Sequence, residues 1–413
     1  MTPDAQHSAL STSQIVADLA TELVDVRRDL HAHPEPSWLE VRTCDVVATR
    51  LEKAGIAVQG LPRSGLVAEV GHPDSDGPVV ALRADLDALP LEDETTDPWR
   101  STVDGVAHAC GHDVHTAALL GAGLALAEQH RVSPLPGRVR LLFQPAEEVM
   151  PGGALDLVAH GVLDDVRSIF ALHCDPSIDV GTIGLREGPI TAATDQVTVR
   201  LRGKGGHTSR PHLTQDLTFA LAKVVTEVPA ALSRRLDPRA GASMVWGRIG
   251  AGSAANVIPA FGEVEGTLRV LDIRAWAAAQ DIVNEVVRAV VAPYGVTPEV
   301  EHVRGVPPVV NDPRAARRLA AAAGQVVGAG ALVGTEQSLG GEDFAWYLES
   351  VPGAMARLGT RTPGGPTFDL HQGNLRVDDA AVPVGAQLLA RAGLGALDDA
   401  SRSTSTLDDV TTR

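Results

Sequence analysis

One eight-residue stretch, His108 to His115, constrains this chain more than any other, because it reads His-Ala-Cys-Gly-His-Asp-Val-His. Three imidazoles, a thiol and a carboxylate stand directly before an apolar run from Ala117 to Ala127, which has the composition of a buried helix. A helix that follows a loop holds the loop's side chains rigidly, and a metal site needs ligands that are held in this way. The stretch therefore predicts a metal site at the start of a buried helix.

The segments around this stretch alternate between helix and strand patterns, which is typical of an α/β fold. Apolar residues at helical spacing predict helices over residues 11–30, 41–54 and 112–129. Short β-rich runs predict strands over residues 56–61, 65–70, 79–83, 138–143 and 168–172.

Polar residues collect where these strands end. Asp85 and Asp87 follow one strand, Glu147 and Glu148 follow another, and His173 ends a third. Open α/β sheets bind ligands at the carboxyl ends of their strands, so we expect these side chains to gather. Residues two apart on an extended segment share a face, whereas neighbours diverge, so the two glutamates can take different roles. A pair of turn-forming aspartates is the alternative interpretation of Asp85 and Asp87.

A different pattern begins after Gly188, where predicted elements follow a β-α-β-β-α-β order over residues 194–202, 213–233, 242–250, 262–270, 274–291 and 299–303. This order predicts an inserted ferredoxin-like domain over residues 189–305. The first pattern then returns, with a helix over 312–327, a helix opened by residues 340–344, a strand near 355–359 and a last helix that ends near Leu397. We therefore expect one catalytic domain from residues 1–188 and 306–400, and a mobile tail over 401–413.

Composition excludes several classes of partner. The net charge of -17 argues against binding to nucleic acid or to an anionic membrane surface. The apolar runs reach only about ten residues, whereas a membrane-spanning helix needs about 20. Three cysteines do not make a disulfide framework, and the first residues show no signal peptide, so we expect a cytoplasmic protein.

Five candidate ligands stand at element ends in the α/β portion: Cys110, His112, Glu148, His173 and His371. A mixed set of nitrogen, oxygen and sulfur donors favours Zn, Mn, Co or Ni over Mg or Ca. More than four ligands predict two ions about 3.5 Å apart. Two alternatives stay open, namely a Cys110 nucleophile activated by His112 or His115, and a closed structural metal site.

Further motifs extend across nearly the whole chain in a fixed order. They are Leu30-His-Ala-His-Pro-Glu35, Leu82-Arg-Ala-Asp-Leu-Asp-Ala-Leu89, His108-Ala-Cys-Gly-His-Asp113, Gln144-Pro-Ala-Glu-Glu148, Gly206-His207, Asn256-Val-Ile-Pro259, Gly266-Thr-Leu-Arg269, Gly341-Glu-Asp-Phe344 and Leu370-His371. Together they resemble the aminoacylase/carboxypeptidase family of dinuclear metallohydrolases, in the branch that contains hippurate hydrolase, N-acyl-L-amino acid amidohydrolases and indole-acetyl-amino-acid hydrolases.

The resemblance implies a zinc-exopeptidase-like catalytic domain with a mixed central sheet, and a ferredoxin-like lid domain that forms a homodimer. It also implies two divalent metal ions per subunit, Mn or Zn before Co or Ni. Carried over residue by residue, it makes Cys110 the bridging ligand and Glu147 the general base. The remaining roles fall on His112, Glu148, His173 and His371 as ligands, Asp87 as the carboxylate that orients a ligand, His207 as the lid histidine that reaches the partner subunit's site, and Asn256 and Arg269 as the groups that hold the substrate carboxylate.

The activity implied by the resemblance is hydrolysis of the amide bond of N-acyl-L-amino acids by a metal-bound water, for which Glu147 is the base. A dipeptidase or aminopeptidase on the same scaffold is the nearest alternative, and a non-catalytic metal-dependent binding protein is a second one. Cys174 departs from the family pattern, because an apolar residue is expected after the ligand His173. We expect a buried thiol there, with redox chemistry as the alternative.

Overall fold

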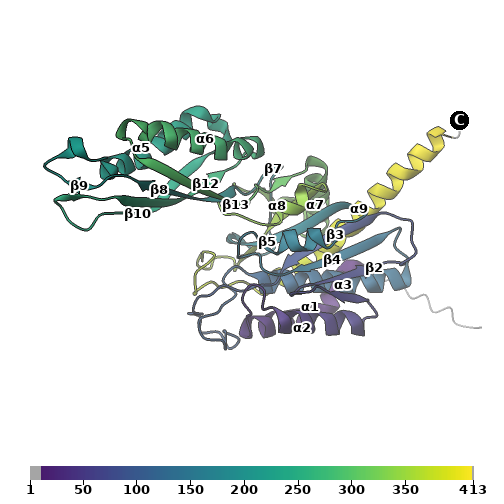
Figure 1. Ribbon diagram of the computed structural model, residues 1–413. Helices are drawn as coiled ribbons and strands as arrows, with labels where there is room; N and C mark the ends of the chain where they lie inside the picture. The colour runs from purple at the N-terminus through teal and green to yellow at the C-terminus, as the bar shows by residue number, and fades with distance from the viewer. Residues whose placement is uncertain (1–10, 412–413) are drawn as a thin grey trace, which may run out of the picture. The chain divides into compact units, whose positions relative to one another are not determined.

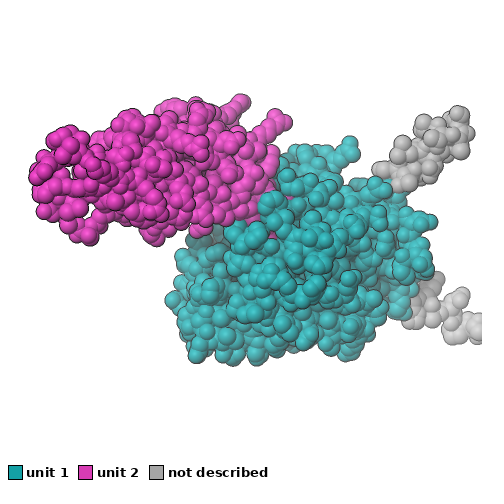
Figure 2. Space-filling model, viewed as in Figure 1, with its two compact units in different colours: residues 1–188, 310–336, 346–413 teal, residues 189–309, 337–345 magenta. Residues whose placement is uncertain are grey.

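The computed structural model describes residues 11–411, with side chains described as far as residue 401. The chain divides into two compact units, coloured teal and magenta in Figure 2. Unit 1 comprises residues 1–188, 310–336 and 346–413, and unit 2 comprises residues 189–309 and 337–345. The segment 337–345, which the sequence patterns assigned to the catalytic domain, belongs to unit 2 because Ser338 N donates to Ile190 O at 2.9 Å. Gln337 Nε2 adds a second bond, to Pro189 O at 3.1 Å.

A mixed sheet forms the centre of unit 1, as the sequence predicted (Figure 1). Its strands follow the order β1-β2-β4-β3-β5-β16-β6-β15, in which β4, β3, β5 and β16 run parallel and β2 and β6 are antiparallel to their neighbours β4 and β16. The strands are β1 Val58–Gly60, β2 Leu66–Val70, β3 Val79–Asp85, β4 Arg138–Gln144, β5 Val166–Asp179, β6 Ile183–Leu185, β15 Leu332–Gly334 and β16 Gly353–Arg361.

The helices of the first part of the chain are α1 Thr12–Ala32, α2 Val41–Lys53, α3 His112–Val132 and α4 Gly153–Ala159, and those of the last part are α7 Pro313–Val326, α8 Ala345–Leu348 and α9 Ala381–Thr411. Helix α3 packs against both α1 and α9. Its small residues permit this close approach, since a Cβ on Gly121 would lie 2.5 Å from Leu23 Cδ1 and 3.0 Å from Ala386 Cβ. Among the described residues, no helix has both the length and the apolar character that crossing a membrane requires.

The prediction that the last helix ends near Leu397 is wrong, because α9 continues to Thr411. The Ser, Thr and Asp residues beyond Leu397 are weak helix formers, which suggested an end, but neither glycine nor proline occurs there to break the helix. The mobility expected of residues 401–413 stays a prediction, and residues 412–413 lie outside the described part of the chain.

Unit 2 contains one antiparallel sheet in the order β10-β12-β8-β13, and Figure 1 shows helices α5 and α6 on the same face of it. The elements are β8 Ala193–Arg202, α5 Leu217–Arg235, β10 Ser243–Ala251, β12 Phe261–Val270, α6 Ile273–Val291 and β13 Thr297–Val306. Their chain order is the predicted β-α-β-β-α-β. Two short strands, β9 Gly206–His207 and β11 Val257–Ile258, pair with each other, and β7 Gly188–Pro189 pairs with β14 Val310–Asn311.

A buried amide fastens strand β16 to its surroundings. Asn311 Nδ2 donates to Arg186 O and to Met355 O, each at 2.9 Å, and its Oδ1 accepts from Met355 N at 2.8 Å. The side chain is only 1% exposed, so water cannot replace these bonds when the amide is removed.

We therefore predict that Asn311→Ala lowers the free energy of unfolding by about 2–4 kcal/mol, because two buried backbone groups of Met355 and the partly buried carbonyl of Arg186 lose their partner. The midpoint of urea unfolding, followed by far-UV circular dichroism, measures this change. Asn284→Ala is the control, since Asn284 donates one hydrogen bond to Gln280 O within its own helix. An Asn311→Ala midpoint equal to that of the control would contradict the prediction.

Candidate metal centre

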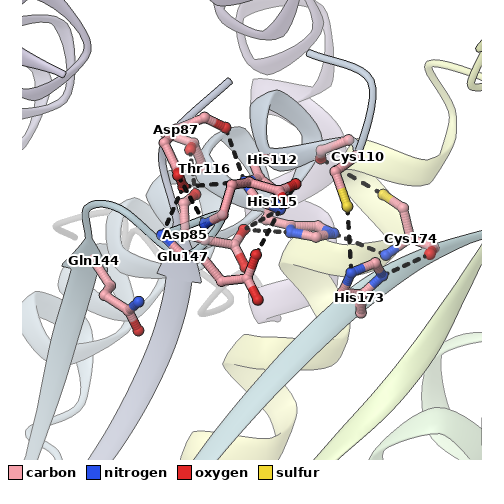
Figure 3. Close-up of polar contacts among 12 residues, drawn as sticks. Asp85, Asp87, Cys110, His112, His115, Thr116, Gln144, Glu147, His173 and Cys174 are labelled. Atoms are coloured by element: carbon pink, nitrogen blue, oxygen red, sulfur yellow. Dashed lines mark hydrogen bonds and ion pairs between the residues drawn. The ribbon is translucent and has the colours of Figure 1, made fainter. Parts of the chain in front are cut away.

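The site lies at the carboxyl ends of β3 and β4, beside the middle of β5, where α3 begins (Figure 3). The prediction that His173 ends its strand is wrong, because the chain beyond His173 goes on pairing with β16 and β5 continues to Asp179. Strands β3, β4 and β5 are parallel neighbours, so the residues at the ends of β3 and β4 meet His173 of β5 at one edge of the sheet. Gly111 precedes α3 with φ +83°, and a Cβ there would lie 2.8 Å from Cys174 Sγ. Only glycine fits this turn, which places Cys110 and His112 on either side of it.

All five predicted ligands come together. Cys110 Sγ lies 3.6 Å from His173 Nε2, His371 Nε2 lies 3.3 Å from Glu148 Oε1, and His112 Nε2 lies 3.9 Å from the same oxygen. Cys110, His112 and His173 form one group whose ligand atoms all lie within 4.8 Å of one another, and Cys110, Glu148 and His371 form a second. Cys110 is common to both groups, which is the position a bridging ligand must take.

Backbone carbonyls orient two of the imidazoles. His112 Nδ1 lies 2.8 Å from Asp87 O, and His173 Nδ1 lies 2.8 Å from Cys174 O. A carbonyl only accepts hydrogen bonds, so each Nδ1 carries a proton, and Nε2 is the nitrogen that each ring can offer to a metal. Among the described residues, His112 Nε2 is buried and makes no hydrogen bond. A buried nitrogen without a hydrogen-bond partner is suited to hold a cation.

A single buried carboxylate holds the two glutamates. Asp87 Oδ1 accepts from Glu147 N and Asp87 Oδ2 accepts from Glu148 N, both at 3.0 Å, and Ser37 Oγ donates to Oδ2 at 2.6 Å. Burial opposes the charge on Asp87, but its contact with His112 and the Ser37 bond outweigh burial and lower the pKa of Asp87.

The glutamates do not diverge as extended neighbours would, and that prediction is wrong. Glu147 Oε2 lies 4.0 Å and Glu148 Oε1 lies 3.9 Å from His112 Nε2, so both carboxylates approach the same imidazole. The chain turns at Ala146, whose φ of +54° is in the left-handed region, and the bend ends the extended geometry on which the prediction depended.

The sequence patterns missed the roles of Asp85 and His115. Asp85 is fully buried and is bound by Arg83 NH1 at 2.6 Å and by His115 Nδ1 at 2.5 Å. His115 Nε2 accepts from Cys174 N at 2.8 Å, so both ring nitrogens of His115 are occupied and it is not a ligand. Its spacing of three from His112 on a helix was the available signal, because such residues lie on one face.

When no metal is bound, Cys110, His112 and His371 all carry protons at neutral pH. Burial, with Glu148 nearby, raises the pKa of the Cys110 thiol. Contacts with Cys110 and Glu148 raise the pKa of His371 to about 10. At neutral pH Cys110 is therefore a thiol, which disfavours the alternative in which it attacks a substrate directly. Cys174 is a buried thiol, as expected, and burial raises its pKa as well.

The residues expected to hold the substrate lie in unit 2. His207 and Asn256 are neighbours, because β9 pairs with β11 and Thr208 N donates to Asn256 O at 3.1 Å. Arg269 stands near the other end of β12, where its NH1 contacts Thr194 Oγ1 and Leu339 O. Phe261, at the first end of β12, is eight residues or about 27 Å from Arg269. One chain does not bring Asn256 and Arg269 together.

The donor set, one thiol, three imidazoles and a carboxylate, would suit two borderline divalent cations, and Cys110 belongs to both ligand groups. Because the pKa values of Cys110 and His371 are raised, both groups carry protons at neutral pH until a metal displaces them. Metal affinity must therefore increase with pH through the range in which these protons are lost.

We predict that loading the metal-free protein with Mn²⁺ or Zn²⁺ at pH 7 releases about three protons per subunit, one each from Cys110, His112 and His371. Titration calorimetry in buffers with different ionisation enthalpies measures this number. His371→Ala should remove about one of the released protons. A proton count of zero for the unsubstituted protein would show that these groups do not bind the metal.

The sequence matches a known protein family and several characterised or putative enzymes. The family model for peptidase family M20/M25/M40 matches residues 81–394. A putative glutamate--cysteine ligase 2-3 of Rhodococcus jostii is 50% identical over 369 residues, which are 89% of this chain and 46% of the relative, so the chain spans about half of that protein. An N-acetylcysteine deacetylase of Bacillus subtilis is 38% identical over 375 residues, which cover 90% of this chain and 95% of the relative.

A solved structure shares the whole architecture. A dinuclear metal-binding peptidase from family M20 of Bacillus subtilis superposes with a TM-score of 0.81 at 35% identity, covering 92% of this chain and 99% of the other. Its description agrees with the two overlapping ligand groups around Cys110. The chain therefore belongs to peptidase family M20/M25/M40, a family of hydrolases.

Proposed function

We propose that the protein is a metal-dependent amidohydrolase that cleaves N-acyl-L-amino acids into a carboxylic acid and a free amino acid. The observation that carries this proposal is the pair Glu147 and Glu148, both bound through their N–H groups to Asp87, beside the ligand groups that share Cys110. The similarity of the chain to an N-acetylcysteine deacetylase supports an N-acyl substrate. A cytoplasmic location stays a prediction from the sequence.

Glu147 is the general base in this proposal. Two divalent cations, Mn or Zn before Co or Ni, would polarise the amide carbonyl and acidify a water when bound. Glu147 then takes a proton from the attacking water and passes it to the amide nitrogen as the C–N bond breaks. The peptide N–H bond to Asp87 holds Glu147 beside the site, so its carboxylate is in place before the substrate arrives.

His207 is suited to steady the negative charge that develops on the carbonyl oxygen. Its Nδ1 accepts from Ser209 N at 3.1 Å, so the neutral ring carries its proton on Nε2, the nitrogen left to donate to an oxyanion. Asn256 is exposed beside it, and Arg269 offers a guanidinium for the substrate carboxylate.

The separation of these residues supports a homodimer. His207 and Asn256 lie near one end of β12 and Arg269 lies near the other, and the strand from Phe261 to Arg269 spans about 27 Å, so one small substrate cannot contact both ends of one unit 2. In a homodimer, the metal site of one subunit would be completed if His207 of the second copy reaches it. Strand β10 is an edge of the sheet and exposes Val245 and Ile249, 63% and 57%, which suits pairing with another unit 2.

We predict that Glu147→Ala lowers kcat by about 10²–10⁴-fold, because the carboxylate proposed to take the proton of the water is removed, while two metals stay bound. Steady-state hydrolysis of N-acetyl and N-benzoyl amino acids, with metal content measured by elemental analysis, tests this. Glu128→Ala, on the surface of α3, is the control that should keep full activity. Turnover near that of the unsubstituted enzyme would refute the base assignment.

The same assay separates the substrate classes. Chelated protein is reloaded with Mn, Zn, Co or Ni and offered N-acyl amino acids beside dipeptides. A clear preference for dipeptides would favour the dipeptidase or aminopeptidase alternative, in which a free α-amine is recognised. Binding without hydrolysis of any compound would favour the non-catalytic alternative.

We predict that mixing two inactive variants restores activity. In a heterodimer of Glu147→Ala and His207→Ala, the subunit that keeps Glu147 receives His207 from its partner, so one of the two sites is complete. Random exchange of subunits should return about a quarter of the original activity, because half of the dimers are mixed. No recovery in a mixture shown to contain heterodimers would contradict a shared site.

A further inference from the structure

The loop between α1 and α2 contains a carboxylate with no exposed surface. Glu40 is 0% exposed, and its two oxygens accept three hydrogen bonds. Trp38 N and Ala146 N donate to Oε1 at 2.9 Å and 2.8 Å, and Ser64 Oγ donates to Oε2 at 2.7 Å. The bond to Ala146 joins positions 106 residues apart in the chain and reaches the residue directly before Glu147.

Ala146 adopts a conformation that alanine does not favour. Its φ of +54° is in the left-handed region, where the Cβ crowds the following backbone. Such a residue keeps this conformation only when its surroundings impose it. Here Glu40 accepts from Ala146 N, and Ala146 O accepts from Gly153 N at 3.0 Å, so both sides of the residue are held.

Three consecutive N–H groups thus point at two buried carboxylates. Ala146 N is bound by Glu40, and the next two N–H groups, those of Glu147 and Glu148, are bound by Asp87. The same loop that provides Glu40 also provides Ser37, which donates to Asp87. The segment 37–40 therefore supports the turn in two ways: Glu40 binds Ala146 N directly, and Ser37 binds the Asp87 carboxylate.

We propose that Glu40 is a positioning residue for the catalytic step: it holds Ala146 in the left-handed conformation and thereby aims the Glu147 carboxylate at the water. This inference rests on the proposed function, in which Glu147 is the base. Glu40 touches neither the ligands nor the water, so it acts on the rate through the backbone alone.

The role requires a hydrogen-bond acceptor and not a charge. Burial raises the pKa of Glu40, so the site does little to favour its ionised form. A glutamine has the same shape, and its Oε1 could accept from Trp38 N and Ala146 N while its Nε2 donates to Ser64 Oγ. Glu40→Gln is therefore the conservative variant, and Glu40→Ala removes the acceptor altogether.

The test compares Glu40→Ala, Glu40→Gln and the double variant Glu40→Ala with Ala146→Gly. We expect Glu40→Ala to lower kcat by about 10–100-fold, with KM changed less than about threefold and two metals still bound. Glu40→Gln should keep kcat within about threefold of the original. Glycine adopts a positive φ without strain, so the double variant should regain about tenfold in kcat over Glu40→Ala.

Glu35 provides a matched control in the same loop. Its carboxylate accepts two backbone N–H groups, from Arg42 at 3.0 Å and Thr43 at 2.8 Å, at the start of α2. Glu35→Ala removes as many backbone bonds but none at the Ala146 turn. It should lower the unfolding midpoint while kcat stays unchanged.

Hydrogen exchange of the peptide that spans residues 144–148 gives a readout that is independent of turnover. Faster exchange in Glu40→Ala than in Glu35→Ala, together with loss and glycine rescue of kcat, supports the proposal. An unchanged kcat in Glu40→Ala, or an equal loss in Glu35→Ala without glycine rescue, overturns it. If Glu40→Ala does not fold, Glu40→Asp with and without Ala146→Gly replaces it, because the shorter side chain cannot reach Ala146 N. Wild-type turnover in Glu147→Ala would instead refute the base itself, whatever the exchange shows.

Discussion

The site depends on the hydrogen bonds of one buried residue, Asp87. Its carboxylate accepts hydrogen bonds from the N–H groups of Glu147 and Glu148 and from the hydroxyl of Ser37. Its backbone carbonyl orients His112. A buried charge is tolerated only when donors surround it, so the folded state requires all of these segments to converge. Asp87 can be buried only when these donors surround it. The end of β3, the turn after β4 and the start of α3 must therefore come together.

The scaffold makes that convergence precise because its parts pack closely. Strands β4, β3 and β5 are parallel neighbours, and the small residues of α3 let it lie directly against α1 and α9. Side chains on such rigid elements do not need to be ordered when a substrate binds, so less of the binding energy is lost. The exposed residues His207 and Asn256 belong to a different unit, and in the proposed homodimer they would serve the partner's site.

Much of this could be read from local patterns. Helical spacing placed α1, α3 and α6 within a few residues of their observed ends, and the strand ends marked where Asp85 and Glu147 would gather, whereas His173 lies inside β5. The metal-type residues were recognisable by their chemistry and by their places at element ends. The role of His115 could not be recognised in this way, because it depends on a hydrogen bond with Cys174 N, which lies 59 residues further along the chain.

Residue types and short-range periodicity thus determined the fold class, the order of the elements and the identity of the candidate ligands, since each of these depends on neighbours within one or two turns of chain. The aim of Glu147, the left-handed turn at Ala146 and the support from Glu40 were settled by packing alone. Their partners are 60 and 106 residues away, and alanine by itself prefers other backbone angles. A strained conformation exists only where distant groups bind it, and no local preference encodes such a contact.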